Sequence, residues 1–258
     1  MTRLKAADLF DGLDPEEKSN SRKLHPPKTG ALESIIQGFD KILKKSEHID
    51  QLDELTAYAL RKVLSQEVHS ADITAFILYI AQSGNYFDEN ETALPVYINA
   101  LLTCCKEAKI HLPLTDLPDL SGLCANIKHK EIYLVGNPGF RFCDSFGGTV
   151  IVEGDASDDV GAWLAGGKII VKGNADYNVG LYMQKGRIVI EGDAGDDLGK
   201  RMDGGLILVR GDVGKNVGDE MKGGRIYLHG KYESLGKPEG GKIYHKGTLI
   251  MKDGVKLT

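Results

Sequence analysis

A short unit of about nineteen residues recurs along the second half of this 258-residue chain and constrains its fold more than any other feature. Each unit contains a run of branched apolar residues that ends on a glycine. Successive run-ending glycines from Gly136 to Gly247 are 18, 19, 19, 19, 19 and 17 residues apart, and another glycine follows seven residues after each central one. The structural glycines that this spacing singles out are Gly154, Gly161, Gly173, Gly180, Gly192, Gly199, Gly211, Gly218 and Gly230.

The repeat predicts a single-stranded parallel β-helix in which each nineteen-residue unit forms one coil. A period near twenty with branched apolar runs is typical of a solenoid, and the spaced leucines of leucine-rich repeats are absent. Glycine would form the corners because it adopts positive φ at little cost. The crossover rule for parallel strands favours right-handed winding. Seven coils about 4.8 Å apart would make a prism about 34 Å long.

Stacked coils turn equivalent positions into columns, and we expect five apolar columns to fill the interior. They are Val150, Ile169, Ile188, Ile207 and Ile226; Val152, Val171, Ile190, Val209 and Leu228; Ala156, Ala175, Ala194 and Val213; Val160, Val179, Leu198 and Val217; and Leu164, Met183, Met202 and Met221. The column Glu153, Lys172, Glu191 and Arg210 alternates in sign, which favours a fixed register between coils.

The middle residue of each strand points outward if its two neighbours point inward. This outward column, here named the apolar stripe, consists of Tyr133, Ile151, Ile170, Val189, Leu208, Tyr227 and Tyr244. A continuous apolar strip on a protein surface marks an interaction site. We therefore expect the apolar stripe to be covered, either by helices of the same chain or by another subunit.

The first half of the chain has a different composition. Five of the 32 glycines precede residue 130, which leaves 27 in the remainder and marks a domain boundary. Residues 1–29 are polar and predict a flexible arm, although Leu4, Leu9 and Phe10 could dock on another surface. Residues 30–110 predict a helical bundle, because apolar residues follow helical spacing in four segments. Residues 111–258 predict a linker and the β-helix, with residues 111–135 and the hairpin-like tail 248–258 guarding its ends.

The repeat unit resembles a known family. Its pattern, apolar-x-apolar-x-Gly-(Asp/Asn)-Ala-x-x-(Asp/Asn)-Val-Gly-x-x-Met-x-Gly-Gly, is similar to the GXGXG-type β-helix over residues 130–247. That domain ends the large subunit of glutamate synthase and forms most of one of the subunits of formylmethanofuran dehydrogenase. The resemblance implies a non-catalytic scaffold that supports catalytic domains or subunits, and no catalytic residue carries over. The first 120 residues resemble no family.

Side chains with catalytic or metal-binding chemistry are scattered. Cys104, Cys105, Cys124 and Cys143 lack the spacing of a metal or iron–sulfur site, so we expect no cofactor and no catalytic residue. The column Asp155, Asn174, Asp193 and Asp212 suits hydrogen bonding in turns, with calcium as the alternative. The basic column Lys168, Arg187, Arg225 and Lys242 is broken by Thr149 and Leu206, which favours a solvated edge over a nucleic-acid track.

Charge and hydropathy narrow the function further. The net charge is −5, no run of 18 apolar residues exists, and no secretory hydrophobic region follows Met1. These features predict a cytoplasmic protein that binds neither membrane nor nucleic acid. The sequence thus predicts a non-enzymatic structural or assembly module that forms homo-oligomers or binds another protein. The alternative is an accessory subunit of a glutamate-synthase-like amidotransferase or a formylmethanofuran-dehydrogenase-like oxidoreductase complex, with catalytic subunits as partners.

Overall fold

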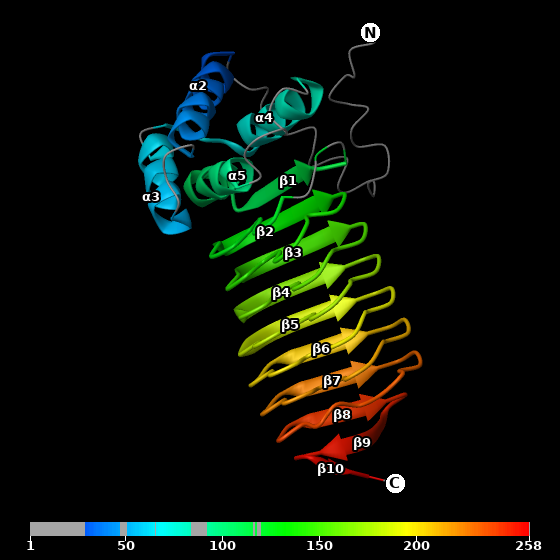
Figure 1. The fold of residues 1–258 in the computed structure, drawn as a ribbon. Coiled ribbons are helices and arrows are strands. Elements are labelled where there is room, and N and C mark those ends of the chain that lie inside the picture. The colour runs from blue at the N-terminus through cyan, green and yellow to red at the C-terminus, as the bar shows by residue number, and fades with distance from the viewer. Residues whose placement is uncertain are drawn as a thin grey trace.

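The residues that the structure describes form a β-solenoid of about seven turns with four helices at one end (Figure 1). The computed structural model describes residues 29–46, 51–64, 66–83, 92–115, 117 and 120–257. The arm predicted for residues 1–29 lies outside these ranges, apart from Thr29. The helices are α2 (Thr29–Ser46), α3 (Leu52–Val63), α4 (Ser70–Ser83) and α5 (Ala93–Cys104). In the described ranges, no helix has both the length and the hydropathy needed to cross a membrane.

The ten strands of the described residues form one sheet and follow one another in chain order (Figure 1). The strands are β1 (Lys109–Pro113), β2 (Lys128–Val135), β3 (Gly147–Glu153), β4 (Ala165–Val171), β5 (Lys185–Ile190), β6 (Leu206–Val209), β7 (Arg225–Leu228), β8 (Lys242–His245), β9 (Thr248–Lys252) and β10 (Val255–Lys256). The pairings from β1 to β8 are parallel. From β3 to β7, the paired residues are nineteen positions apart, as in Ile151 with Ile170, except that Ala165 pairs with Lys185 across a register shift. The predicted solenoid is therefore confirmed.

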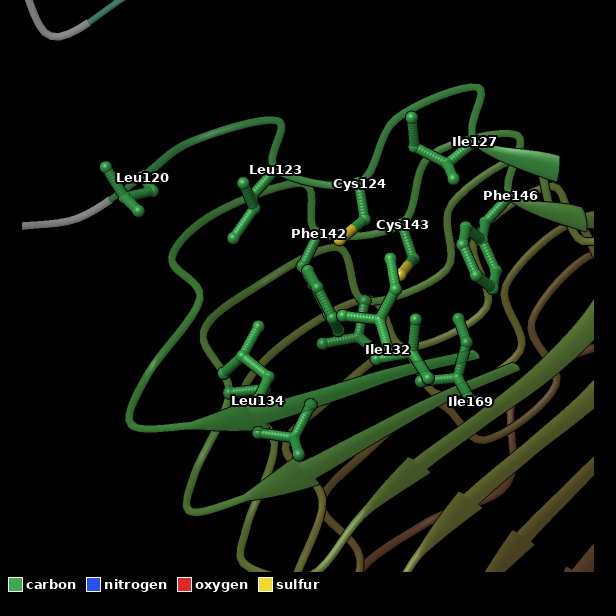
Figure 2. Close-up of a cluster of buried hydrophobic side chains, with 14 of the residues drawn as sticks. Leu120, Leu123, Cys124, Ile127, Ile132, Leu134, Phe142, Cys143, Phe146 and Ile169 are labelled. Atoms are coloured by element: carbon green, nitrogen blue, oxygen red, sulfur yellow. The ribbon is translucent and has the colours of Figure 1, made fainter. Parts of the chain in front are cut away.

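The five predicted interior columns are all buried, and no member of them is more than 7% exposed. In the first coils, some interior side chains are larger than those at the equivalent positions, Val160 and Leu164, of the next coil. Phe142 and Phe146 fill the space beside Ile132, and Cys124 and Cys143 point into the same cluster (Figure 2). Burial raises the pKa of the Cys143 thiol well above its usual range. Both cysteines are free, and their surroundings are those of inert core residues.

The sequence suggests that the structural glycines are needed for positive φ, and this is true of only some of them. Gly161, Gly180, Gly199 and Gly218 do have a positive φ, between 65° and 72°. Gly192 does not, but a Cβ on it would lie 2.3 Å from Asn174 Oδ1 and 2.6 Å from the Gly173 oxygen. Close packing between coils, and not a positive φ, therefore excludes a side chain at Gly192. The same steric reason applies to Gly173, Gly211 and Gly230.

Corners also contain Asp and Asn residues, which suit turns because they tolerate positive φ. Asp159, Asn178, Asp197 and Asn216 have φ between 59° and 61°, as expected for the residue types that tolerate this region best.

The column of Asp155, Asn174, Asp193 and Asp212 forms hydrogen bonds to the neighbouring coil. The Asp193 backbone N–H donates to Asn174 Oδ1 at 2.8 Å, and the Asp212 N–H donates to Asp193 Oδ1 at 2.7 Å. The same bond joins Asn174 N to Asp155 Oδ1 and Lys231 N to Asp212 Oδ1, each at 2.7 Å. These side chains therefore link successive coils, whereas the turn interpretation placed their bonds within one turn.

The helices pack on the first strand of the solenoid. β1 begins at Lys109, inside the stretch expected to be the end of the last helix and the connector. The reason is the alternation of buried Ile110 and Leu112. Helix α4 packs against β1, where the Thr74 hydroxyl donates to the His111 oxygen at 3.0 Å. Asn99 on α5 adds a second link, accepting a hydrogen bond from the Cys124 N–H at 2.7 Å.

At the other end, the chain reverses direction. β9 pairs antiparallel with β8, and β10 pairs antiparallel with β9. The turn between β9 and β10 holds Asp253 and Gly254 at φ 47° and 78°, the combination typical of a tight hairpin. The predicted hairpin in the tail is confirmed.

Glu107 connects the helices to the solenoid. Its carboxylate lies 2.7 Å from His69 Nδ1 and accepts hydrogen bonds from the Ser70 N–H at 3.1 Å and the Cys105 thiol at 3.2 Å. Lys130 on β2 donates to the Glu107 carbonyl oxygen at 2.9 Å. Burial alone would raise the pKa of Glu107, but these hydrogen bonds outweigh it and lower the pKa from 4.5 to about 2.

We expect Glu107→Gln to lower the free energy of unfolding by about 1–2 kcal/mol at pH 7. This loss of stability is small because the Glu107 side chain is 37% exposed and water screens its charge. A carboxyl with a lowered folded-state pKa stabilises the protein above pH 4.5 and loses that contribution as the pH falls towards 2. Urea unfolding at several pH values should show the wild-type advantage shrinking across this window. Glu153→Gln, on an exposed carboxylate, is the control, and an advantage that persists at pH 2 would contradict this role.

Candidate functional site

The outward face of strands β2 to β8 carries the apolar stripe as one unbroken ladder. Tyr133 pairs with Ile151, and each later member pairs with the next, as far as Tyr227 with Tyr244. All seven stripe residues are half-buried, whereas from Tyr133 to Tyr227 the residues on either side of each one in its strand are buried. The structure thus brings together every residue of the predicted stripe.

The stripe has aromatic ends and an aliphatic centre. The Tyr227 and Tyr244 rings stack at 4.7 Å between centroids and 7° between planes. At the other end, the Tyr133 ring stacks on His111 at 5.0 Å, and its hydroxyl donates to Glu131 Oε1 at 2.5 Å. Rigid aromatic rings with polar tips are the side chains that interfaces favour.

The described helices do not cover this face. They lie beyond the β1 end of the solenoid (Figure 1), and their packing against the sheet is that of α4 on β1. Of the two covers expected from the sequence, helices of the same chain are therefore not observed over the stripe in the described ranges. From Ile151 to Tyr244 the apolar stripe faces outward.

Basic side chains flank the stripe on both sides. In the coils of β4 to β8, the positions two residues before and after each stripe residue include one acidic residue, Glu191, which directly follows β5. They also include seven basic residues, of which the second, fourth and last directly follow their strands: Lys168, Lys172, Arg187, Arg210, Arg225, Lys242 and Lys246. Lys172 lies 3.5 Å from Glu153 on the adjacent strand. Glu131 and Glu153 flank the stripe on β2 and β3, so the excess of positive charge lies over β4 to β8, although the whole chain has a net charge of −5.

This concentration of charge is not evident when the basic column and the column that alternates in sign (Glu153, Lys172, Glu191 and Arg210) are considered separately. Both columns lie two residues from the stripe in each strand, so strand alternation places all three on one face. The signal is present in the spacing once the three columns are considered together.

The chemistry of the face is suited to binding. In the ranges that the structure describes, no three His, Cys, Asp or Glu side chains gather as metal ligands would. His229 and His245 lie in successive coils and are the two histidines that could form a pair. His245 instead places Nε2 2.9 Å from the Gly230 oxygen and packs its ring against Tyr232, so both of its contacts are structural.

No protein-family model matches this sequence, and no curated protein is significantly similar to it. The function must therefore be inferred from the geometry and charge of this face.

Proposed function

We propose that this protein is a non-catalytic assembly module that binds a protein partner through the outward face of β2 to β8. The observation that carries the proposal is an apolar stripe with a charged border that none of the described helices covers. An apolar centre inside a polar rim is the usual anatomy of a protein–protein interface.

The size of the face limits the kind of complex. Six steps of about 4.8 Å give the stripe a length of about 29 Å, and five residues of strand give a width of about 13 Å. The flat footprint is therefore about 400 Å², against about 800 Å² per partner in a standard stable interface. Either the partner also contacts the edges of the coils, or the complex is transient.

Charge favours a different protein over a second copy. In a two-fold pair, an axis across the stripe sets the column of Lys168, Arg187 and Arg225 against itself, and the column of alternating charge offsets this only in part, by setting Lys172 opposite Glu191. An axis along the stripe sets Lys168 opposite Lys172, and the pairing of Arg187 with Glu191 offsets this only in part. Like charges placed directly opposite destabilise an interface. We therefore infer that the partner presents an acidic surface with an apolar ridge.

This inference supports the role of accessory subunit over that of homo-oligomer. The resemblance to the GXGXG-type β-helix agrees with it, since that domain braces catalytic parts of larger enzymes. In the same proposal the coils are nineteen-residue units wound right-handed, residues 30–110 form a helical bundle as a domain of their own, and the protein acts in the cytoplasm.

The test uses the tagged full chain and quantitative mass spectrometry of proteins captured from extract of the source cells, after nuclease treatment. We expect Val189→Asp and the pair Arg187→Glu/Arg225→Glu to reduce capture of a shared acidic protein at least about tenfold, or about 1.4 kcal/mol. Lys215→Glu is the control, because Lys215 is 60% exposed and lies outside this face. Capture that the face variants leave unchanged, or that nuclease abolishes, would overturn the proposal. A purified chain that dimerises through this face would restore the homo-oligomer.

A further inference from the structure

A second surface feature lies on the stretch of each coil that leads into strands β4 to β7. Four residues, nineteen positions apart, stack there: Trp163, Tyr182, Arg201 and Glu220. The Trp163 and Tyr182 rings are parallel, with centroids 4.2 Å apart and 13° between planes. The Arg201 guanidinium lies 5.5 Å from the Tyr182 ring centroid and donates to its hydroxyl.

Arg201 is fixed from its other side as well. Its Nε donates to Glu220 Oε2 at 2.8 Å, and its terminal nitrogen donates to Glu220 Oε1 at 3.2 Å. Hydrogen bonds from Arg201 lower the pKa of the Glu220 carboxyl. The guanidinium is thus held beside the Tyr182 ring by its hydrogen bond to the Tyr182 hydroxyl and its two-point contact with Glu220.

The backbone gives no reason for these side chains. All four residues have φ between 52° and 57°, where bulky side chains are uncommon and cost about 1–2 kcal/mol each. In the two preceding coils the same position holds Asn126 and Ser145, with φ of 59° and 52°. A small polar residue therefore satisfies the coil, and the aromatic pair calls for another explanation.

The four residues line a cleft of about 420 Å³. Gln184, Asp203 and Lys222, each two residues beyond a member of the stack, also line it. The volume falls within the range of small-molecule sites, about 300–1,000 Å³. Trp163, the only tryptophan of the chain, is 43% exposed at this cleft.

The lining selects the chemistry of a ligand. Arg201 and Glu220 neutralise each other, and Asp203 balances Lys222, so the cleft favours neither an anion nor a cation. Among the described residues, the side chains of Gln184, Asp203 and Lys222 have no hydrogen-bond partner, which leaves both donors and acceptors for a ligand. The aromatic pair adds an apolar surface. A ligand that suits this lining is neutral, has hydroxyl groups that donate and accept, and has an apolar face.

We propose that this cleft binds a neutral carbohydrate. The hydroxyl groups of a sugar donate to Asp203 and accept from Lys222. The facing sides of the Trp163 and Tyr182 rings cover each other, so the C–H groups of the sugar pack against the ring edges that border the cleft. The site extends over four coils, about 14 Å, which suits a short chain of sugars.

The experiment uses the full chain and a panel of neutral trisaccharides: maltotriose, cellotriose, xylotriose and chitotriose. Because Trp163 is the only tryptophan, its fluorescence reports on the cleft directly, and we expect a saturable change with at least one member. By calorimetry, Trp163→Ser, which installs the residue of the preceding coil, and Asp203→Ala should weaken binding at least about tenfold. Tyr177→Ser, on an aromatic residue that is 54% exposed and outside the cleft, should leave binding unchanged.

The proposal is overturned if no trisaccharide binds at about 10 mM, a level that would still detect millimolar affinity, or if the variants bind as well as the parent. Preference for sulfated or phosphorylated sugars would also overturn it, because the cleft would then select charge. Thermal melting confirms that each variant is folded. Trp163→Ser should leave protein capture by the sheet face unchanged, so the two proposals stand or fall separately.

Discussion

Ile169→Ala should lower the free energy of unfolding by about 2–5 kcal/mol, while the same change at the next residue, Ile170→Ala, should cost about 1 kcal/mol or less. The side chains are identical and adjacent, but they point to opposite sides of β4. Ile169 is fully buried between Val150 and Ile188, so its loss leaves a cavity. Ile170 is half-buried on the outer face, where water fills the space left behind.

Urea unfolding followed by circular dichroism measures both variants against the parent, and equal slopes of free energy against urea show that the same surface is exposed. The matched pair removes the intrinsic preference of isoleucine for strands from the comparison. Equal losses at the two positions would contradict the assignment of inside and outside. The same measurement checks that Ile170 is available to a partner without being needed for the fold.

Gly180→Ala should cost about 2–5 kcal/mol, from two separate causes. Gly180 has φ of 72°, where an added Cβ costs about 1–2 kcal/mol. That Cβ would also lie 2.5 Å from Ile207 Cδ1, and such overpacking costs about 1–3 kcal/mol.

A double-mutant cycle separates the two causes. Ile207→Val removes the Cδ1 atom and by itself costs about 0.5–1.5 kcal/mol. If the overlap is real, the double variant loses about 1–3 kcal/mol less than the sum of the two single losses. Additive losses would mean that only the backbone is strained. Gly30→Ala in α2 is the control: nothing lies within 4 Å of its added Cβ, and alanine should not destabilise the helix.

The columns were predictable because each coil repeats the same physical environment. Once Ile169, Ile188 and Ile207 occupy equivalent places in successive units, their burial follows from the register, and so does the outward position of Ile170. The hairpin at Asp253 and Gly254 was predictable for a similarly local reason. Both depend on nearby sequence or exact repetition.

The rest depends on contacts between segments that do not repeat. Helical spacing could not show that the helices pack on β1 and leave the apolar stripe uncovered, because any apolar helix face needs a cover somewhere. The Glu107 contacts join residues almost forty positions apart. A side chain at Gly192 is excluded by Asn174 in the preceding coil. The residue preferences of a single turn do not include such a contact between coils. The stack on Trp163 differs in residue type at each coil, so the repeat hides it.

The two ends of the sheet also decide how copies of this molecule can meet. An open edge of parallel strands is a template on which further chains can add, as in a fibre. Here helix α4 occupies one edge, with the Thr74 hydroxyl on a β1 carbonyl, and the reversed strands β9 and β10 occupy the other. The stack of parallel coils therefore ends at β8, and contact flank against flank joins copies without using either edge.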